Sequence, residues 1–466
     1  MIRFGTSGWR GVIGEDFTFE NVRIASQGIA NHLKSTGEGD AGMVVGYDTR
    51  FLSEKFALEA SRVLAWNGIP AWLCSRDVPT PCVSFETIRR SAAGAINFTA
   101  SHNPPEYNGL KVSTATGAPA MPDVTHAIEK EIQAIQERHE TIDVYPRQEL
   151  IEMIEPKERY LAALRARIDT EAIRQSGLRI GVDSLYGTSR DYLDYFLLDS
   201  GVEVKIIHNY RDPYFGGFSP ECDHRNLAGL RRLVPQENLD VGLATDGDAD
   251  RFGIVDDRGR FISANLILAL LAVYLKRERG LPGGLARSVA TTHLIDRIAE
   301  KFEVPLFETS VGFKFIGELI LQDKIALGGE ESAGLSIHGH LPEKDGILAC
   351  LLVAEMLARS GKSLQQLSRE LFDEFGPRYS KRIDIKLTPQ LTESLHKRLH
   401  TPPARLDGMK VIKVTTIDGV KLQFDQQRWL LFRLSGTEPV ARIYGEACSP
   451  RDLKALLDSG RKFVVR

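Results

Sequence analysis

Several features are scarce in this chain of 466 residues, and each scarcity excludes a class of protein. The five cysteines are scattered with no C-x-x-C pair, which argues against a disulfide framework or a zinc site. The longest apolar stretch, residues 266–275, is far shorter than the roughly 20 residues of a membrane span, and the N-terminus lacks the apolar core of a signal peptide. A formal net charge of −3 gives no basic surface for nucleic acid. We therefore expect a cytoplasmic protein with no membrane or nucleic-acid partner.

The order of apolar runs and helical patterns indicates an α/β protein. Three segments predict a strand that a polar turn and a helix follow. The strands are expected at residues 42–48, 178–183 and 288–292, and the helices at 52–66, about 189–199 and 294–302. Because these units recur at a spacing of roughly 110 to 130 residues, they suggest three related α/β domains rather than a solenoid.

The last part of the chain follows a different pattern. Residues 382–386, 409–414 and 429–433 alternate like half-buried strands, and a helix is expected from 450 to 459. Linking helices are predicted at 122–140 and 157–168, and Gly and Pro interrupt the helical pattern near residue 376. We therefore predict three α/β domains at 1–150, 151–259 and 260–376, and a C-terminal α+β domain at 377–466.

A serine in a polar turn is the most informative single feature. The segment T-A-S-H-N-P-P-E-Y-N-G-L-K-V at residues 99–112 puts Ser101 directly after an apolar run. It is not a G-x-S-x-G elbow and lacks the acid partner of a serine hydrolase. His102 could merely cap the turn. Lys111 could shuttle a proton if its pKa is lowered, or it could be an ordinary surface lysine.

An acidic cluster suits a hard cation. The sequence D-G-D-A-D-R closes a predicted strand and brings Asp246, Asp248 and Asp250 together, and like charges this close repel unless a cation neutralises them. Ligands that offer only oxygen favour Mg²⁺ or Ca²⁺. An EF-hand loop is excluded, because its sixth and twelfth positions would be Arg251 and Asp257 instead of Gly and Glu. The alternative is a solvated acidic turn.

Other loops offer groups that bind phosphate or sugar. Residues 433–439 read R-L-S-G-T-E-P and offer a guanidinium, hydroxyls and backbone N–H groups for a phosphate, although S-G-T is also common in turns. Residues 328–334, G-G-E-E-S-A-G, pair carboxylates with a hydroxyl that could hold a sugar. Arg10 in a glycine-rich N-terminal segment and Lys344 are further cations. A serine, a cation site and a phosphate loop together argue for phosphoryl transfer.

These segments together resemble the α-D-phosphohexomutase family, which includes phosphoglucomutase and phosphomannomutase. The resemblance implies four domains around a central cleft, three of them doubly wound α/β and the last α+β. Ser101 would be the phosphoserine and would complete a Mg²⁺ site with Asp246, Asp248 and Asp250. The other residues that the resemblance places near the reacting phosphoryl group are Arg10, His102, Lys111 and Arg251. Glu330 and Ser332 would bind sugar hydroxyls, Lys344 would lie near the sugar or its phosphate, and Arg433, Ser435, Gly436 and Thr437 would hold the phosphate that does not react.

The resemblance also implies a reaction. A hexose monophosphate would accept a phosphoryl group from Ser101, turn over as a 1,6-bisphosphate and return its other phosphoryl group. The G-E-E-S loop is more like that of phosphoglucomutases, because phosphomannomutase-type loops usually carry G-E-x-S-G-H where this chain has Ala333 and Gly334. We therefore expect glucose phosphate as substrate, Mg²⁺ as cofactor, glucose 1,6-bisphosphate as intermediate, and a monomer or homodimer. The alternatives are a phosphomannomutase, a dual enzyme, a phosphoglucosamine mutase or a metal-dependent sugar phosphatase.

Overall fold

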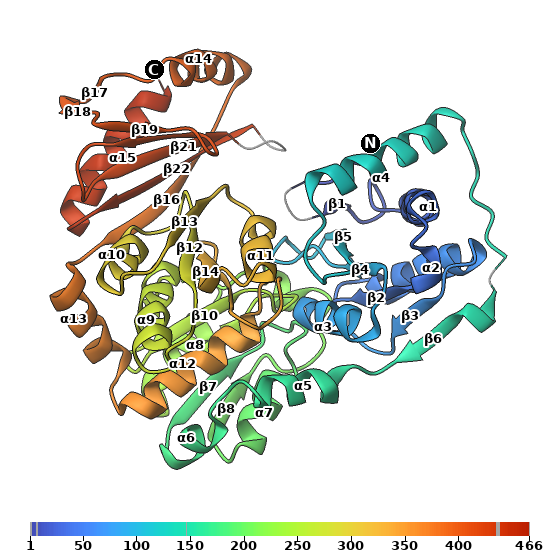
Figure 1. The fold of residues 1–466 in the computed structure, drawn as a ribbon, viewed down its shortest axis with the longest axis horizontal. Coiled ribbons are helices and arrows are strands. Elements are labelled where there is room, and N and C mark those ends of the chain that lie inside the picture. The colour runs from blue at the N-terminus through green and yellow to red at the C-terminus, as the bar shows by residue number, and fades with distance from the viewer. Residues whose placement is uncertain (1, 6–7, 146, 435–438, 466) are drawn as a thin grey trace.

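Four main sheets with their helices make up the described chain, which is a computed structural model of residues 2–5, 8–145, 147–434 and 439–465 (Figure 1). The first sheet has the order β1-β5-β4-β2-β3-β6, with parallel pairing of β2, β3, β4 and β6 and antiparallel pairing at the edge that holds β1 and β5. Its strands are β1 (Trp9–Val12), β2 (Met43–Tyr47), β3 (Ala71–Cys74), β4 (Gly94–Phe98), β5 (Tyr107–Thr114) and β6 (Ile151–Ile154). Its helices are α1 (Phe19–Thr36), α2 (Ser53–Trp66), α3 (Thr80–Arg90) and α4 (Pro122–Glu137).

The second sheet has the order β11-β10-β9-β7-β8. Its strands are β7 (Arg179–Asp183), β8 (Glu203–Ile207), β9 (Val241–Thr245), β10 (Phe252–Asp256) and β11 (Phe261–Ile262), and the helices of this region are α5 (Lys157–Arg165), α6 (Thr170–Gln175), α7 (Leu193–Asp199) and α8 (Ala228–Gln236). Strands β9 and β10 form an antiparallel hairpin, so the loop that joins them lies at one end of this strand pair.

The third sheet, β13-β12-β14-β15, shares a hydrophobic core with the second. Its elements are β12 (Gly284–Ser288), β13 (Leu306–Thr309), β14 (Ile325–Glu330), β15 (Gly334–Ile337), α9 (Ala264–Arg277), α10 (Leu294–Lys301), α11 (Phe313–Leu321), α12 (Gly346–Ser360) and α13 (Leu364–Phe375). Buried residues Leu243 of β9, Leu268 of α9 and Leu351 of α12 belong to one continuous cluster. The second and third units are therefore joined by apolar packing.

The last sheet is antiparallel, in the order β16-β22-β21-β20-β19, and has its own core. Its elements are β16 (Tyr379–Lys386), β19 (Lys413–Thr415), β20 (Val420–Gln423), β21 (Trp429–Leu434), β22 (Val440–Ala447), α14 (Pro389–His400) and α15 (Pro450–Val465), with a small ribbon of β17 (Arg405–Leu406) and β18 (Met409–Lys410) beside them. The expected architecture of three α/β units and a C-terminal α+β unit is confirmed.

Two predicted strands are wrong in position. The strand expected at 288–292 is β12, which ends at Ser288 because the chain turns there: the Thr291 backbone N–H donates to the Ser288 carbonyl at 3.1 Å, and Val289 and Ala290 pack against Trp429 of the last sheet. The strand expected at 409–414 is divided between β18, which pairs with β17, and β19, which pairs with β20. Most predicted helices are present with shifted ends, and Ser263 caps α9 by accepting a hydrogen bond from the Leu266 backbone N–H.

The predicted domain limits stay predictions. Strands lie just beyond two of them: β6 follows residue 150 yet pairs with β3, and β11 follows residue 259 yet pairs with β10. The limit at residue 376 falls between α13 and β16. Within the described residues, every helix is too short or too polar to cross a lipid bilayer.

Candidate active site

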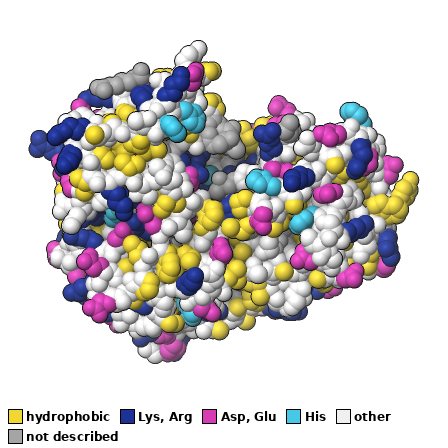
Figure 2. All heavy atoms as spheres, turned by 45° about the horizontal axis from the view of Figure 1, so that its top comes forward, with side chains coloured by type: hydrophobic (Ala, Val, Ile, Leu, Met, Phe, Trp, Pro, Cys, Tyr) yellow, Lys and Arg dark blue, Asp and Glu magenta, His cyan; other side chains and the backbone are white. Residues whose placement is uncertain are grey.

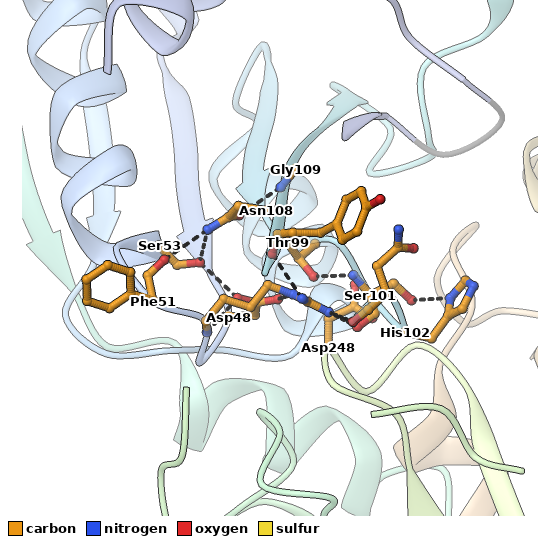
Figure 3. Close-up of polar contacts among 12 residues, drawn as sticks. Asp48, Phe51, Ser53, Thr99, Ser101, His102, Asn108, Gly109 and Asp248 are labelled. Carbon is orange, nitrogen blue, oxygen red and sulfur yellow. Dashed lines mark hydrogen bonds and ion pairs between the residues drawn. The ribbon is translucent and has the colours of Figure 1, made fainter. Parts of the chain in front are cut away.

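The turn after β4 presents Ser101 in an unusual backbone conformation. Its φ is +50°, in the left-handed region that serine seldom adopts, and its side chain is almost fully buried. The Thr99 hydroxyl accepts a 2.8 Å hydrogen bond from the Ser101 backbone N–H. Ser101 Oγ donates to Asp246 Oδ2 at 2.8 Å. It also lies 3.3 Å from His102 Nδ1 (Figure 3). The serine hydroxyl therefore faces the acidic cluster directly.

The acidic cluster lies on the β9–β10 loop. Asp246, Asp248 and Asp250 are buried, and each offers a carboxylate oxygen within 4.8 Å of the others. Burial raises the pKa of Asp246 well above its usual range, and the charges of Asp248 and Asp250 raise it further. Asp248 Oδ1 and Asp250 Oδ1 have no hydrogen-bond partner among the described residues. Unpartnered buried carboxylate oxygens fit a hard divalent cation such as Mg²⁺.

Two buried lysines contact the cluster from different units. Lys111 Nζ of β5 lies 2.6 Å from Asp248 Oδ2 and 2.8 Å from Asp250 Oδ2, and Lys344 Nζ lies 3.2 Å from Asp250 Oδ2. Burial acts to lower the pKa of Lys111, but the two carboxylates outweigh it and the pKa is raised. The lowered pKa that a proton shuttle at Lys111 would need is not found in this arrangement, in which Lys111 is an ion-pair partner.

Further cations surround the serine. The Arg10 guanidinium donates to Asn103 Oδ1, and burial together with the charge of Arg251 lowers the pKa of Arg10 to about 10, so Arg10 stays charged at neutral pH. Burial, and then Arg251 and Arg10, hold the pKa of His102 well below its usual range, so the imidazole is neutral. The Arg251 backbone N–H donates to Asp246 Oδ1 at 3.1 Å. These groups form a positive environment suited to a phosphoryl group.

A cavity of about 240 Å³ lies where the second, third and last units meet. Arg251, Ser332, Arg382 and Tyr444 are among its lining residues. Figure 2 shows the surface hollowed between the lobe of the last sheet and that of the first. The predicted sugar-binding residue Ser332 thus meets Arg251, which the sequence places at the acidic cluster.

Glu330 is buried beside this cavity rather than on its wall. It accepts a 2.7 Å hydrogen bond from the Gly312 backbone N–H. Burial and the neighbouring charge of Glu331 raise the pKa of Glu330 to about 7. Near neutral pH this carboxyl group can therefore both donate and accept hydrogen bonds.

Of the residues predicted to bind phosphate in the loop 433–439, the structure describes Arg433. Arg433 Nε lies 2.9 Å from both carboxylate oxygens of Asp418, and Asp418 Oδ2 accepts from the Val311 backbone N–H at 3.1 Å. The other predicted members, Ser435, Gly436 and Thr437, lie outside the described residues. Arg433 does not line the 240 Å³ cavity.

Sequence reasoning missed residues that support the site from a distance. Thr80, at the start of α3, donates to Asp248 Oδ2 at 2.6 Å, and Asn97 donates to the Thr80 hydroxyl at 2.8 Å. Arg50 is fully buried beneath the Ser101 turn, and Asp418 holds Arg433. Each is a single polar residue with no local motif, and only the fold reveals its partner.

Comparison with known proteins gives matches along nearly the whole chain. Four profiles of one family match in order: phosphoglucomutase/phosphomannomutase α/β/α domain I at residues 1–139, domain II at 158–259, domain III at 263–375 and the C-terminal domain at 395–461. A phosphoglucomutase/phosphomannomutase of Thermococcus kodakarensis is 32% identical over 99% of this chain and 98% of its own length. A phosphoglucomutase of Komagataeibacter xylinus is 30% identical over 98% and 89% of the two chains.

A solved structure agrees with these matches. The crystal structure of a proposed phosphomannomutase from Thermus thermophilus superposes with a TM-score of 0.88 and 35% identity, covering 100% of this chain and 99% of the other. Matches of this extent show that the chain belongs to the phosphoglucomutase/phosphomannomutase family, the phosphohexomutases, which are isomerases that act by phosphotransfer.

Proposed function

We propose that this chain interconverts α-D-glucose 1-phosphate and glucose 6-phosphate, with Ser101 as the phosphoryl carrier and glucose 1,6-bisphosphate as the intermediate. One observation carries the proposal: Ser101 Oγ lies 2.8 Å from Asp246 Oδ2, beside two buried carboxylate oxygens that have no hydrogen-bond partner among the described residues. A hydroxyl next to a divalent-cation site is what phosphoryl transfer through a phosphoserine requires. We expect the enzyme to be a cytoplasmic monomer or homodimer.

The residues around Ser101 would stabilise the negative charge of the phosphoryl group in two ways. Asp246, Asp248 and Asp250 would hold Mg²⁺ together with an oxygen of the phosphorylated serine. When bound, Mg²⁺ supplies positive charge that neutralises the phosphoryl oxygens. Arg10 and Arg251 would face the remaining phosphoryl oxygens, because Arg10 bonds Asn103 of the serine turn and the charges of both arginines act on His102 next to Ser101.

The transfer itself conserves atoms and charge. The free hydroxyl oxygen of the sugar phosphate bonds to phosphorus while the bond from phosphorus to Ser101 Oγ breaks. The sugar hydroxyl loses its proton, and Ser101 Oγ gains one, which restores the donor that Asp246 Oδ2 accepts from in the present structure. After the bisphosphate turns over, the same steps run in reverse at the other end of the sugar.

The far side of the cleft would hold the rest of the substrate. Ser332 lines the cavity, and Glu330 and Lys344 lie buried near it. Arg433, with Ser435, Gly436 and Thr437, would bind the phosphate that does not react. One phosphate site at this end must accept the sugar in two orientations, so we expect this end to be less rigid than the serine end.

The sugar loop favours glucose as the substrate. Gly334 occupies the place where phosphomannomutase-type loops carry histidine, and a Cβ atom there would collide with Lys344 Cδ. A histidine would therefore displace a lysine that pairs with Asp250. Mannose phosphate is the second candidate. A relative named "Probable phosphoglucosamine mutase", from Methanothermobacter thermautotrophicus, is 32% identical over 94% of this chain and 92% of its own, so glucosamine phosphate is a third.

A coupled assay tests the proposal. The purified chain with Mg²⁺ and a trace of glucose 1,6-bisphosphate is given glucose 1-phosphate, mannose 1-phosphate or glucosamine 1-phosphate, and the 6-phosphate product is measured. We expect the highest kcat/KM on glucose 1-phosphate and no detectable isomerisation by Ser101→Ala. Ser61→Ala is the matched control, because Ser61 is a buried serine that donates only to the Ala57 carbonyl within α2.

The other outcomes are distinct. Full activity of Ser101→Ala would exclude the phosphoserine, and release of inorganic phosphate without isomerisation would indicate a phosphatase. A higher kcat/KM on mannose 1-phosphate or glucosamine 1-phosphate would keep the mutase chemistry but replace the proposed substrate.

A further inference from the structure

A single guanidinium organises the backbone of the serine turn. Arg50, which follows β2, is fully buried and lies inside the loop between β4 and β5. Its two terminal nitrogens donate to four backbone carbonyls, three of that loop and one of the first residue of β5, at 2.7 to 3.0 Å. These belong to Ser101, Asn103, Pro104 and Tyr107. The loop that carries the reacting serine is thus folded around one arginine side chain.

A second layer of hydrogen bonds fixes that arginine. Arg50 Nε donates to Asp48 Oδ2 at 3.0 Å, and Asp48 Oδ1 accepts from the Ser53 hydroxyl at 2.9 Å. Asn108 of β5 donates to the Ser53 hydroxyl at 2.9 Å and accepts from the Gly109 backbone N–H at 2.8 Å. Figure 3 shows this network running from Ser53 and Asn108 to the turn of Ser101. The network therefore ties the end of β2, the start of α2 and β5 to one site.

The second unit closes this arrangement from the other side. The Phe215 ring lies under the Arg50 guanidinium, with 5.0 Å from Cζ to the ring centre. Gly247, within the acidic loop, approaches the Ser101 carbonyl so closely that a Cβ atom there would be 2.8 Å from its oxygen. The carbonyl that Arg50 holds is thus the same one against which the acidic loop packs.

The energetic cost of this arrangement indicates a role beyond fold stability. A fully buried ion pair loses the hydration of both charges, and its replacement by apolar side chains is often neutral or stabilising. A serine at positive φ also costs energy and persists only where its surroundings hold it in place. Arg50 and Asp48 are buried although this loses their hydration. The hydrogen bonds that Arg50 makes hold Ser101 in the left-handed conformation, which would otherwise be unfavourable.

We propose that Arg50 is a positioning residue that holds Ser101 in its left-handed conformation and so keeps Oγ directed at Asp246 for phosphoryl transfer. The inference rests on the proposed phosphoserine chemistry. It assigns Arg50 no contact with substrate, and it predicts an effect on the rate of transfer rather than on substrate binding.

Arg50→Lys is the test, since lysine keeps the charge but cannot reach four carbonyls and a carboxylate with three donors. We expect kcat to fall roughly 100-fold, because a displacement of about 1 Å at a reacting group has that effect. The KM for glucose 1-phosphate should stay within about threefold. The rate at which glucose 1,6-bisphosphate phosphorylates Ser101, followed by intact-protein mass spectrometry, should fall by the same factor as kcat.

Arg287→Lys is the matched control. Arg287 is a buried arginine of β12 that pairs with Asp296 and Glu308, away from the serine turn. This variant should lose thermal stability yet phosphorylate Ser101 at the wild-type rate. Equal slowing in both lysine variants would overturn the inference, as would a folded Arg50→Lys enzyme with wild-type kcat. If Arg50→Lys does not fold, Ser53→Ala decides: a rate of Ser101 phosphorylation reduced about tenfold supports the inference, and an unchanged rate overturns it.

The design separates this inference from the proposed function. Failure of the wild-type chain to phosphorylate Ser101, or full activity of Ser101→Ala, would refute the phosphoserine mechanism itself. Phosphorylation of wild-type Ser101 together with a wild-type rate in Arg50→Lys would refute only the role of Arg50.

Discussion

The serine end and the phosphate end of the cleft are held in different ways. At the serine end, Arg50 bonds four carbonyls of the turn, Thr80 donates to Asp248, and Lys111 bridges Asp248 and Asp250. At the phosphate end, the described guanidinium of Arg433 is held by Asp418, which is bonded to the Val311 backbone N–H. Among the described residues, many buried bonds from two units fix the serine end, and fewer fix the phosphate end.

The contacts between units include buried polar groups at both ends. The first and second units meet through buried polar contacts such as Arg190 with Asp77 at 2.5 Å. The last sheet meets the third through a small apolar cluster around Trp429 and through polar contacts as well, since Lys421 Nζ donates to the Val289 carbonyl at 2.9 Å and the His293 backbone N–H donates to Glu446 Oε1 at 3.0 Å. A phosphoryl carrier loses rate with small displacements, whereas a site that receives a substrate in two orientations gains from freedom to adjust.

The largest effect is expected when the serine end is broken at Asp250. Asp250→Asn removes a carboxylate that faces both Lys111 and Lys344 and one of the oxygens that would bind Mg²⁺. We expect Mn²⁺ affinity, measured by calorimetry, and activity at fixed Mg²⁺ to fall by about 100-fold or more. Loss of one partner from a buried ion pair should also lower the free energy of unfolding by about 3 kcal/mol.

A buried carboxylate away from the cluster is the control for Asp250. Asp256 ends β10 and pairs with Arg260 at 2.5 Å, so Asp256→Asn should reduce stability while Mn²⁺ affinity stays unchanged. Wild-type Mn²⁺ affinity in Asp250→Asn would show that the cation binds elsewhere, and the contrast between the two ends would lose its main support.

A smaller effect is expected at the phosphate end. Asp418→Asn keeps the shape of the side chain but removes the charge that holds Arg433. The ion pair is partly exposed, so we expect the KM for glucose 1-phosphate to rise about fivefold, while kcat stays within about twofold. Initial-rate kinetics measure both. Asp425→Asn, which breaks a surface pair with Arg428 in the same unit, should leave KM unchanged.

A fall in kcat without a change in KM for Asp418→Asn would contradict the comparison. It would mean that the phosphate end also controls the reacting geometry.

The sequence was informative where chemistry is contiguous and uninformative where it is assembled by the fold. Asp246, Asp248 and Asp250 follow one buried strand within five residues of chain, so their meeting could be predicted. Thr80 reaches Asp248 from 168 residues away, and Arg50 reaches the Ser101 carbonyl from 51 residues away. A lone threonine or arginine carries no periodic or motif signal. Its partner depends on how the fold places loops that are far apart in the sequence.

The fold followed the same rule. Strand β2 was predictable because it is a short run of apolar residues, all of them buried, and helix α2 because its apolar residues recur at helical spacing. Residues 289–292 resembled a strand, but Val289 and Ala290 are apolar because they meet the last sheet, a contact between units that a local pattern cannot distinguish from strand pairing. The sequence left open whether the pKa of Lys111 is lowered, since the two carboxylate partners that raise this pKa come from another sheet.

The remaining expected effect is a pH dependence at Glu330, on the sugar side of the cleft. Its pKa is raised to about 7 because it is buried and lies next to Glu331. An acid that holds its proton more tightly in the folded state makes folding most favourable below the unfolded pKa, which is 4.5 here, and this contribution is lost as pH rises through about 7. Glu330→Gln copies the neutral form at every pH. Between pH 5 and pH 8 the free energy of unfolding of Glu330→Gln should therefore rise relative to wild type by up to about 3 kcal/mol.

Urea denaturation at several pH values measures this difference in the free energy of unfolding. Ser332→Ala is the control that distinguishes titration of Glu330 from a general disturbance of the loop. Ser332 lies on the same loop and has no titratable group, so its variant should follow the pH dependence of the wild-type protein. A difference between Glu330→Gln and wild type that does not change with pH would mean that Glu330 is already ionised at pH 5, with its charge compensated by the Gly312 N–H and nearby cations. Glu330 would then only accept hydrogen bonds from the sugar. The sugar side of the cleft, like the serine side, would then carry a carboxylate that stays charged between pH 5 and pH 8.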